Sequence, residues 1–579
     1  MQVRGLPAAA GIAIGPAWRL RPAGRHADPV PDIRAAAARA ADDLAALAGR
    51  VRASGHPGEA DILDAQALMA TDPMLVDEAE SRAAAAGIFG ASLDPDALAA
   101  TVEAAARSAA ELLAGLQDPM LAARAADVRD VGARIARIIS GRTLALPDRP
   151  SIAVAEDLPP SITAEIPPGC LLGLAIEGGS PVSHAAILAR GLGIPAVVAA
   201  QGLMAAVGAA DGPDDGLMVG LDGDRGTVDL APSAERIAGL EKARAERRQQ
   251  AGVAATLRDQ PGRTADGTLI PLLANIGRPD DAARAIAAGA EGVGLFRTEF
   301  LFLGRSDAPS EDEQLAAYEA VLRAFGPDRP VVIRLADIGG DKEVPYFHLA
   351  HEANPFLGIR GLRLAYDDRS LLVTQVRAIA RAGAAAAVTP WVMAPMVATA
   401  EDVALVHEIV AEALAALDAA GLSRAPALVV GIMVEVPSAA LSAADLAGDV
   451  AFFSIGSNDL TQYVLAMDRT NARLAAIADG LHPAVLRAIR ATVDGAATAG
   501  IPVAVCGELA ADPAGALVLV GLGVSELSMD PSSLDAVRMA LSRVSMAELR
   551  ALGESALRAR TAGEVRVAAA ALLEPRATA

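Results

Sequence analysis

The chain is poor in cysteine and in aromatic residues. Of its 579 residues only Cys170 and Cys506 are cysteines, and Phe, Trp and Tyr together make up 3%. Two cysteines so far apart do not provide the disulfide framework of a small secreted protein. The apolar fraction of 53% therefore consists mainly of aliphatic residues. At this length we expect about three to four domains.

Positive charge is also scarce. The chain contains 50 Lys and Arg and 71 Asp and Glu, which gives a net charge of −21 and a pI near 4.8. This balance argues against non-specific binding of nucleic acid, and an anionic substrate would need arginines gathered locally. The longest uncharged runs, 191–210 and 382–400, contain prolines and predict buried core, not membrane spans. The N-terminus lacks a signal-peptide layout, so we expect a cytoplasmic protein.

Eight strand-like apolar runs alternate with Ala-rich, helix-length stretches in residues 261–579. The runs are Leu269–Gly277, Gly292–Arg297, Pro330–Asp337, Val392–Val397, Leu428–Pro437, the run that begins at Ala451, Pro502–Glu508 and Val524–Met529. This alternation is typical of parallel strands joined by crossover helices. Eight runs favour a closed (β/α)8 TIM barrel, although an open doubly wound sheet shows the same alternation.

Polar side chains follow five of these runs. They are Arg297 and Glu299, Arg334 and Asp337, Glu435, Asn458 and Asp459, and Cys506 and Glu508. In a barrel the C-terminal ends of the strands meet at one mouth, where catalytic residues lie. Carboxylates are ligands for hard divalent cations, and Arg binds phosphate. One such residue alone is usually a surface ion-pair partner or a helix cap, but five together predict a metal and anion site.

The first half of the chain predicts two kinds of structure. Residues 31–143 have apolar residues at helical spacing and breaks near Ser54–Pro57, Thr71–Pro73, Ser92–Pro95 and Asp118–Pro119, which indicates a helical bundle. Residues 1–30 and 144–231 carry short strand-like runs, so we expect a small α/β domain into which the bundle is inserted. Residues 232–260 are charged and Ala-rich, which predicts a linker helix before the barrel.

A glycine-rich loop leads from Glu177 to Ser183, and an apolar helix is predicted to begin near His184. The free N–H groups of a helix N-terminus attract anions, so a phosphoryl group carried by His184 would be well placed. A histidine at the start of a helix is more often a cap or a packed residue than a nucleophile. The loop by itself leaves the role of His184 open.

Over essentially its full length the chain resembles enzyme I of the bacterial phosphoenolpyruvate-dependent sugar phosphotransferase system. The resemblance rests on motifs that occur in the family's order. They are Gly11–Gly15, Ala125–Gly132, Ser183-His184, Gly292–Phe302, Asp337–Lys342, Asn354-Pro-Phe-Leu-Gly358, Met433–Pro437, Phe453–Tyr463 and Cys506–Leu509.

The resemblance implies a phosphoenolpyruvate-protein phosphotransferase. The phosphoryl group of phosphoenolpyruvate would pass to His184 and then to a histidine of the carrier protein HPr, the first step of the sugar phosphotransferase system. Glu435 and Asp459 would hold Mg²⁺. The remaining implied roles are substrate binding by Arg297, Arg334, Asn458, Arg469 and, less directly, Arg360, proton donation by Cys506, and orientation of His184 by Thr163. The bundle would bind HPr, and the barrel would form a homodimer.

Two departures from the family pattern predict local differences. Val182 replaces the usual Thr of the histidine loop, with Pro181 before it, and Leu335-Ala336 replaces Thr-Met after Arg334. We expect altered substrate affinity from the second change, because no charge is lost. Pyruvate, phosphate dikinase and phosphoenolpyruvate synthase share the histidine domain and the barrel, but they add an ATP-binding unit for which this sequence leaves no room. A non-catalytic paralogue would lack the nucleophile or the metal pair.

Overall fold

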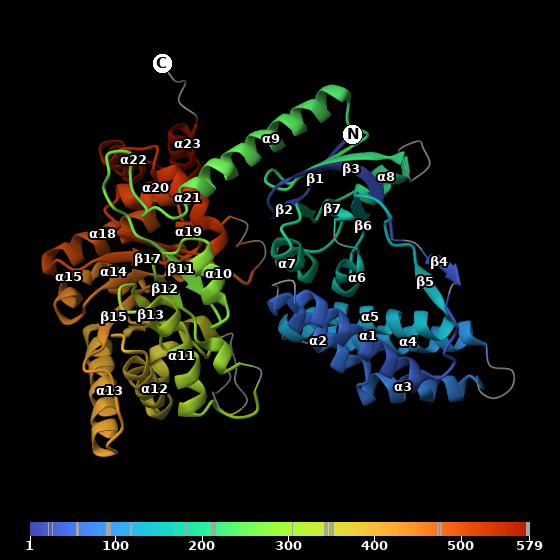
Figure 1. Cartoon of the computed structure of the whole chain (residues 1–579), viewed down its shortest axis with the longest axis horizontal. Coiled ribbons are helices and arrows are strands. Elements are labelled where there is room, and N and C mark those ends of the chain that lie inside the picture. Colours follow the sequence, from blue (N-terminus) through green and yellow to red (C-terminus); the bar gives the residue numbers. More distant parts are fainter. Residues whose placement is uncertain are drawn as a thin grey trace. The chain divides into compact units, whose positions relative to one another are not determined.

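The computed structural model of the chain describes residues 1–574, apart from 21, 26, 54–56, 89–93, 116–118, 168, 181–182, 210–215, 304, 341–345, 347–351, 472–473 and 475–476. The chain divides into two compact units, Met1–Gln249 and Gln250–Ala579 (Figure 1). The boundary falls inside helix α9, Ala234–Thr256, in the segment 232–260 for which the sequence predicts a linker helix.

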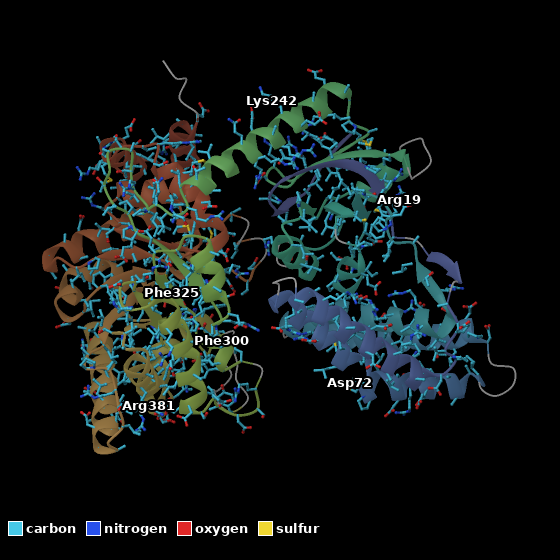
Figure 2. All side chains as sticks on the ribbon, viewed as in Figure 1. Arg19, Asp72, Lys242, Phe300, Phe325 and Arg381 are labelled. Atoms are coloured by element: carbon cyan, nitrogen blue, oxygen red, sulfur yellow. The ribbon has the colours of Figure 1, made fainter. Side chains whose placement is uncertain are left out.

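Five helices of the first unit form the predicted bundle. They are α1 (Ile33–Ala53), α2 (Pro57–Ala70), α3 (Pro73–Ala85), α4 (Pro95–Ala114) and α5 (Pro119–Ser140). Each of the last four begins at a proline, whose fixed φ and missing N–H suit the first helical position. Asp72 (labelled in Figure 2) and Asp94 cap α3 and α4 by accepting the N–H of Met74 and of Asp96. The apolar faces of the helices meet in one shared core.

An eight-stranded mixed sheet makes up the rest of this unit, in the order β1-β10-β9-β3-β6-β7-β8-β2. Its strands are β1 (Gln2–Arg4), β2 (Leu6–Ala9), β3 (Ile12–Trp18), β6 (Ser151–Ala155), β7 (Leu171–Ile176), β8 (Ala196–Val198), β9 (Met218–Asp222) and β10 (Thr227–Leu230). Strand β3 precedes the bundle and pairs in parallel with β6, which follows it, so the bundle is inserted into one α/β fold. A short ladder joins β4 (Pro22–Arg25) to β5 (Arg142–Leu144).

Three short helices accompany the sheet: α6 (Pro160–Glu165), α7 (His184–Gly191) and α8 (Leu203–Ala209). Ile162 of α6 and Ala185, Ala186 and Ala189 of α7 are buried in one apolar cluster with strands β6, β7 and β8. This packing fixes the helix that begins at His184 against the sheet.

The second unit is a closed barrel of eight parallel strands, which confirms the (β/α)8 prediction and excludes the open sheet. The strands are β11 (Leu272–Ile276), β12 (Val293–Phe296), β13 (Val331–Arg334), β14 (Trp391–Ala394), β15 (Val429–Val434), β16 (Phe453–Ile455), β17 (Val503–Val505) and β18 (Glu526–Met529). Strand β11 pairs with both β12 and β18, which closes the ring.

The helices of the barrel unit surround the strands (Figure 1). The main ones are α10 (Asp281–Ala287), α11 (Glu311–Phe325), α12 (Ser370–Ala386), α13 (Ala400–Ala419), α16 (Ser457–Leu465), α18 (Pro483–Ala499), α20 (Pro513–Gly521), α21 (Leu534–Leu541), α22 (Met546–Arg558) and α23 (Ala562–Leu573). Shorter ones are α14 (Pro437–Leu441), α15 (Ala443–Leu446) and α19 (Glu508–Ala511). Among the described residues no helix has both the length and the apolar character needed to cross a bilayer.

Candidate active site

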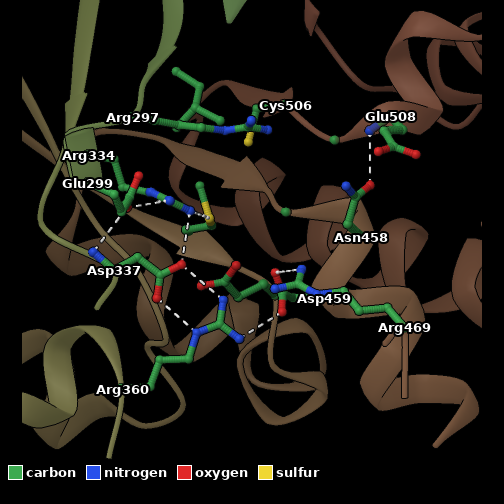
Figure 3. Close-up of a pocket in the computed structure, with 15 residues that line it drawn as sticks. Arg297, Glu299, Arg334, Asp337, Arg360, Asn458, Asp459, Arg469, Cys506 and Glu508 are labelled. Atoms are coloured by element: carbon green, nitrogen blue, oxygen red, sulfur yellow. Dashed lines mark hydrogen bonds and ion pairs between the residues drawn. The ribbon is translucent and has the colours of Figure 1, made fainter. Parts of the chain in front are cut away.

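A cavity of about 480 Å³ opens at the C-terminal ends of strands β12, β13, β15, β16 and β17 (Figure 3). It is lined by Leu295, Arg297, Glu299, Arg334, Asp337, Arg360, Met433, Glu435, Gly456, Asn458, Asp459, Arg469, Cys506, Gly507 and Glu508. All eight barrel residues for which the sequence predicted a role are in this set. The five strand ends therefore meet at one mouth, as predicted.

Arg334, the last residue of β13, is held by two buried carboxylates. Its Nη2 donates to Oε1 of Glu299 at 2.6 Å, and its Nη1 lies 3.3 Å from Oδ2 of Asp337. Glu299 also accepts the backbone N–H of Asp337 at 3.1 Å. Burial opposes the charged form of Arg334, but Glu299 and Asp337 raise its pKa above the ordinary value. Arg334 is therefore a fixed positive charge at the side of the cavity.

Arg360 extends this ion-pair network across the mouth. Its Nε and Nη2 each donate to Asp337 at 2.9 Å, and its Nη1 donates to Oδ1 of Asp459 at 2.9 Å. Arg469 donates to the other oxygen of Asp459 at 3.0 Å. The Arg360 side chain is only 1% exposed, whereas that of Arg469 is 33% exposed. Arg360 is thus a buried support, and Arg469 is within reach of a bound anion (Figure 3).

Glu435 follows β15 and is 1% exposed. One of its oxygens accepts the N–H of Met396 at 2.7 Å, and Met396 has a φ of +60°, which non-glycine residues rarely adopt. Burial, and then the negative charges of Asp459 and Asp337, raise the pKa of Glu435. Arg360 and Arg334 act against this rise, so burial is the main reason that the ionised form of Glu435 is disfavoured.

The carboxylates fit a hard divalent cation. Four arginines and five carboxylates line the cavity, so its formal charge is −1 when all are ionised. A cation bound by Glu435 and Asp459 would reverse that sign. Within the described residues no group of three or more His, Cys, Asp or Glu could hold a metal ion. Glu435 and Asp459 would provide two ligands and leave the other positions to substrate and water, which is how Mg²⁺ is commonly bound.

Cys506 follows β17 and is 2% exposed. Its Sγ lies 3.6 Å from the carbonyl oxygen of Ile455. Burial raises the pKa of the thiol, so it stays protonated at neutral pH. Sequence reasoning missed two residues that support it: Asn275 Nδ2 donates to the Cys506 carbonyl at 2.9 Å, and Ser528 donates to Asn275 at 2.6 Å. The sequence feature that could have indicated Asn275 is the presence of a polar amide within the apolar run of β11.

Asn458 and Arg297 complete the cavity. Oδ1 of Asn458 accepts the N–H of Glu508 at 3.0 Å, which connects the tips of β16 and β17 and orients the amide. Arg297 follows β12 and is exposed, and in the described part of the chain no carboxylate forms an ion pair with it. Its guanidinium is therefore available to an incoming anion.

His184 and Thr163 belong to the other compact unit. His184 is the first residue of α7, as the loop pattern predicted, but its side chain, Pro181 and Val182 lie outside the described residues. Thr163 is 2% exposed in α6, and its hydroxyl donates to the carbonyl of Pro159 at 3.1 Å. The lone pairs of this hydroxyl can still accept a hydrogen bond.

Known families match most of the chain. The family described as PEP-utilising enzyme, PEP-binding domain, matches residues 251–546, the mobile domain of PEP-utilising enzymes matches 147–229, and their N-terminal domain matches 4–124. A phosphoenolpyruvate-protein phosphotransferase of Geobacillus stearothermophilus is 37% identical over 97% of this chain and 96% of its own length. The chain belongs to the phosphoenolpyruvate-protein phosphotransferase family.

Other relatives show how far this family likeness extends. A phosphoenolpyruvate-protein phosphotransferase of Streptomyces coelicolor is 42% identical, with 99% of each chain aligned. A multiphosphoryl transfer protein of Xanthomonas campestris is 42% identical over 97% of this chain but only 66% of its own length. A second one, from Rhodobacter capsulatus, is 44% identical over 79% of this chain and 54% of its own. The chain thus spans between half and two thirds of the length of these two multiphosphoryl transfer proteins.

Proposed function

We propose that the chain is a phosphoenolpyruvate-protein phosphotransferase, a phosphotransferase with a nitrogenous acceptor. It takes the phosphoryl group of phosphoenolpyruvate onto His184 and passes it to a histidine of the carrier HPr. The observation that carries the proposal is the convergence of arginines, a carboxylate pair, an amide and a buried thiol in one barrel cavity. The names of the relatives aligned along nearly their whole length support the same reaction.

The four arginines of the cavity would serve substrate binding in two different ways. Arg297 and Arg469 can reach the phosphate and carboxylate of phosphoenolpyruvate, while Arg334 and Arg360 set the positive potential from fixed positions. Asn458 adds an amide donor beside them. Phosphoryl transfer asks a protein mainly for positioning and charge neutralisation, and this set supplies both.

Glu435 and Asp459 would hold Mg²⁺. When bound, the cation supplies positive charge against the phosphate and carboxylate oxygens of the substrate. The formal charge of −1 on the cavity explains why a highly anionic substrate would need it. We expect chelation of divalent cations to abolish the reaction.

The chemical step uses a neutral imidazole, which histidine provides near pH 7. A ring nitrogen of His184 bonds to phosphorus as the bond from phosphorus to the enol oxygen breaks, and the electron pair leaves with the enolate. Cys506 then donates its proton to the methylene carbon, which gives pyruvate, and the thiolate regains a proton from water. Thr163 would accept the other imidazole N–H and fix the tautomer.

The other parts of the chain take the roles that the family resemblance implies. We propose that the α/β domain formed by residues 1–30 and 144–231 carries the phosphohistidine, and that the bundle within 31–143 binds HPr. Residues 232–260 would link the α/β domain to the barrel, and the barrel, 261–579, would bind phosphoenolpyruvate. Homodimerisation through the barrel and a cytoplasmic location remain predictions. Sedimentation analysis of the purified chain would test the first of these.

Pyruvate release tests the proposal. Purified protein is mixed with phosphoenolpyruvate and Mg²⁺, and pyruvate is followed with lactate dehydrogenase and NADH. We expect a burst of one pyruvate per chain that then stops, and continuous release once HPr is added. Chelator should remove the burst. Absence of a burst with Mg²⁺ present would contradict the enzyme, and a burst that HPr does not convert to turnover would contradict the carrier.

A further inference from the structure

The motif Asn354-Pro-Phe-Leu-Gly358 has no role in the reaction described above. Its Phe356 lies in the short 3-10 helix η4, Pro355–Leu357, in the connection between β13 and α12. The centre of the Phe356 ring is 5.9 Å from Cζ of Arg360 and 5.4 Å from Cζ of Arg469. Both distances are within the reach of about 6 Å at which a cation is attracted to an aromatic face.

The two arginines that contact this ring also hold one carboxylate. Nη1 of Arg360 and Nη1 of Arg469 donate to the two oxygens of Asp459, at 2.9 and 3.0 Å. Two guanidiniums so close to each other repel, and Asp459 and the ring face each offset part of that repulsion. Phe356 is thus part of the electrostatic surroundings of the proposed metal ligand.

The backbone around Phe356 is held firmly. The hydroxyl of Tyr463 donates to the carbonyl of Phe356 at 2.5 Å, and Tyr463 belongs to α16, the helix that carries Asp459. Nη1 of Arg363 donates to the carbonyls of Leu357 and Gly358, each at 3.0 Å. The backbone that carries the ring is therefore fixed by contacts to α16 and to the 3-10 helix η5, Gly361–Tyr366.

The two arginines depend on the ring to different degrees. Arg360 is buried and makes three hydrogen bonds to carboxylates, so it would stay in place without the ring. Arg469 has one ion pair through its guanidinium and is one-third exposed. For Arg469 the ring face is a major remaining constraint.

We propose that Phe356 is a positioning residue, whose ring face holds the Arg469 guanidinium at the cavity in the orientation that receives an anionic group of phosphoenolpyruvate. The inference rests on the proposed function and adds a residue to the substrate site. If the inference is right, the electron density of the Phe356 ring, and not only the volume of the ring, determines KM for phosphoenolpyruvate. The turnover number kcat should depend much less on the electron density of the ring.

A fluorine series separates these two properties. Phenylalanine carrying one, two or three fluorines is introduced at position 356 of the full-length protein, which weakens the negative ring face at nearly constant shape. We expect KM for phosphoenolpyruvate to rise stepwise, by about 2- to 5-fold in total, with kcat nearly constant. The same series at Phe300, whose ring stacks on Phe296 with centres 5.9 Å apart, should leave KM unchanged.

Ordinary substitutions provide a second readout. Phe356→Leu should raise KM for phosphoenolpyruvate. Phe356→Tyr, which keeps the ring face, should have a KM close to that of the unsubstituted protein. The unsubstituted protein and both variants should melt at similar temperatures. A flat fluorine series, or a Phe356→Leu protein with unchanged KM, would overturn the inference and leave the proposed function standing. If the unsubstituted protein releases no pyruvate, both fail, so the two failures are distinguishable.

Discussion

At the scale of single residues, the charges of the cavity fall into two groups. Arg334 and Arg360 are buried and form ion pairs with Glu299, Asp337 and Asp459. Buried ion pairs are expensive to desolvate and add little net stability, so their value here is fixed geometry. Arg297 and Arg469 are exposed enough to exchange water for substrate.

The clearest residue-scale prediction concerns Arg297. Arg297→Ala should lower kcat/KM for phosphoenolpyruvate by about 10- to 100-fold, because it removes a charge-assisted contact that no buried carboxylate already occupies. Arg297→Lys should recover part of the loss, since the charge remains but the planar fork is gone. The pyruvate assay measures both, and an alanine variant with wild-type kcat/KM would show that Arg297 does not bind substrate.

A second residue-scale prediction concerns Cys506. Burial raises the pKa of its thiol, so the thiol should keep its proton to higher pH than an exposed cysteine, whose pKa is about 8.5. In a Cys170→Ser protein, the rate of alkylation by iodoacetamide should rise with a midpoint above that value. The reciprocal Cys506→Ser protein reports on the half-exposed Cys170 as the comparison. A Cys506 midpoint below about 8.5 would contradict the expected effect of burial on the thiol.

At the scale of secondary-structure elements, much of the fold could be predicted from the sequence. All eight barrel strands lie within or overlap the predicted apolar runs, and four bundle helices begin at Pro57, Pro73, Pro95 and Pro119 beside the predicted breaks. Strands β1, β2 and β10 of the first unit form no distinct strand-like run in the sequence, because they are three or four residues long and show little periodicity. Short strands are defined by their pairing partners, which a sequence does not display.

The candidate site shows the same limit. Strand ends predicted which residues gather at the mouth, because the chemistry follows from the residue types and the topology. Which arginine pairs with which carboxylate depends on distances between segments far apart in sequence, such as Arg360 and Asp459. The supporting Asn275 and the ring of Phe356 were missed for the same reason.

Helix packing gives an element-scale prediction. Gly132 of α5 lies against α4 so closely that an added Cβ would be 2.2 Å from Cβ of Ala106. Gly132→Ala should therefore force the helices apart and destabilise the bundle by about 1–3 kcal/mol. Gly49 of α1 has no atom within 4 Å of such a Cβ, so Gly49→Ala should be neutral or stabilising by roughly 0.5–1 kcal/mol. Urea unfolding monitored by circular dichroism compares the two, and equal effects would contradict this packing.

At the scale of the whole molecule, the chemistry is divided between two compact units. The proposed anion and metal site belongs to Gln250–Ala579, and His184 belongs to Met1–Gln249. The proposed transfer therefore requires a state in which His184 reaches the barrel cavity. The boundary between the units lies inside the charged helix α9, in the segment 232–260 for which the sequence predicts a linker helix.

The measurement that tests this account most directly is the location of the phosphoryl group. The protein is incubated with phosphoenolpyruvate labelled in its phosphate and Mg²⁺, digested, and the labelled peptide is sequenced by mass spectrometry, beside a His184→Ala protein. We predict one label per chain, stable to base, labile to acid and confined to the peptide that contains His184, with none in the variant. Label on another residue, or equal labelling of the His184→Ala protein, would contradict the account.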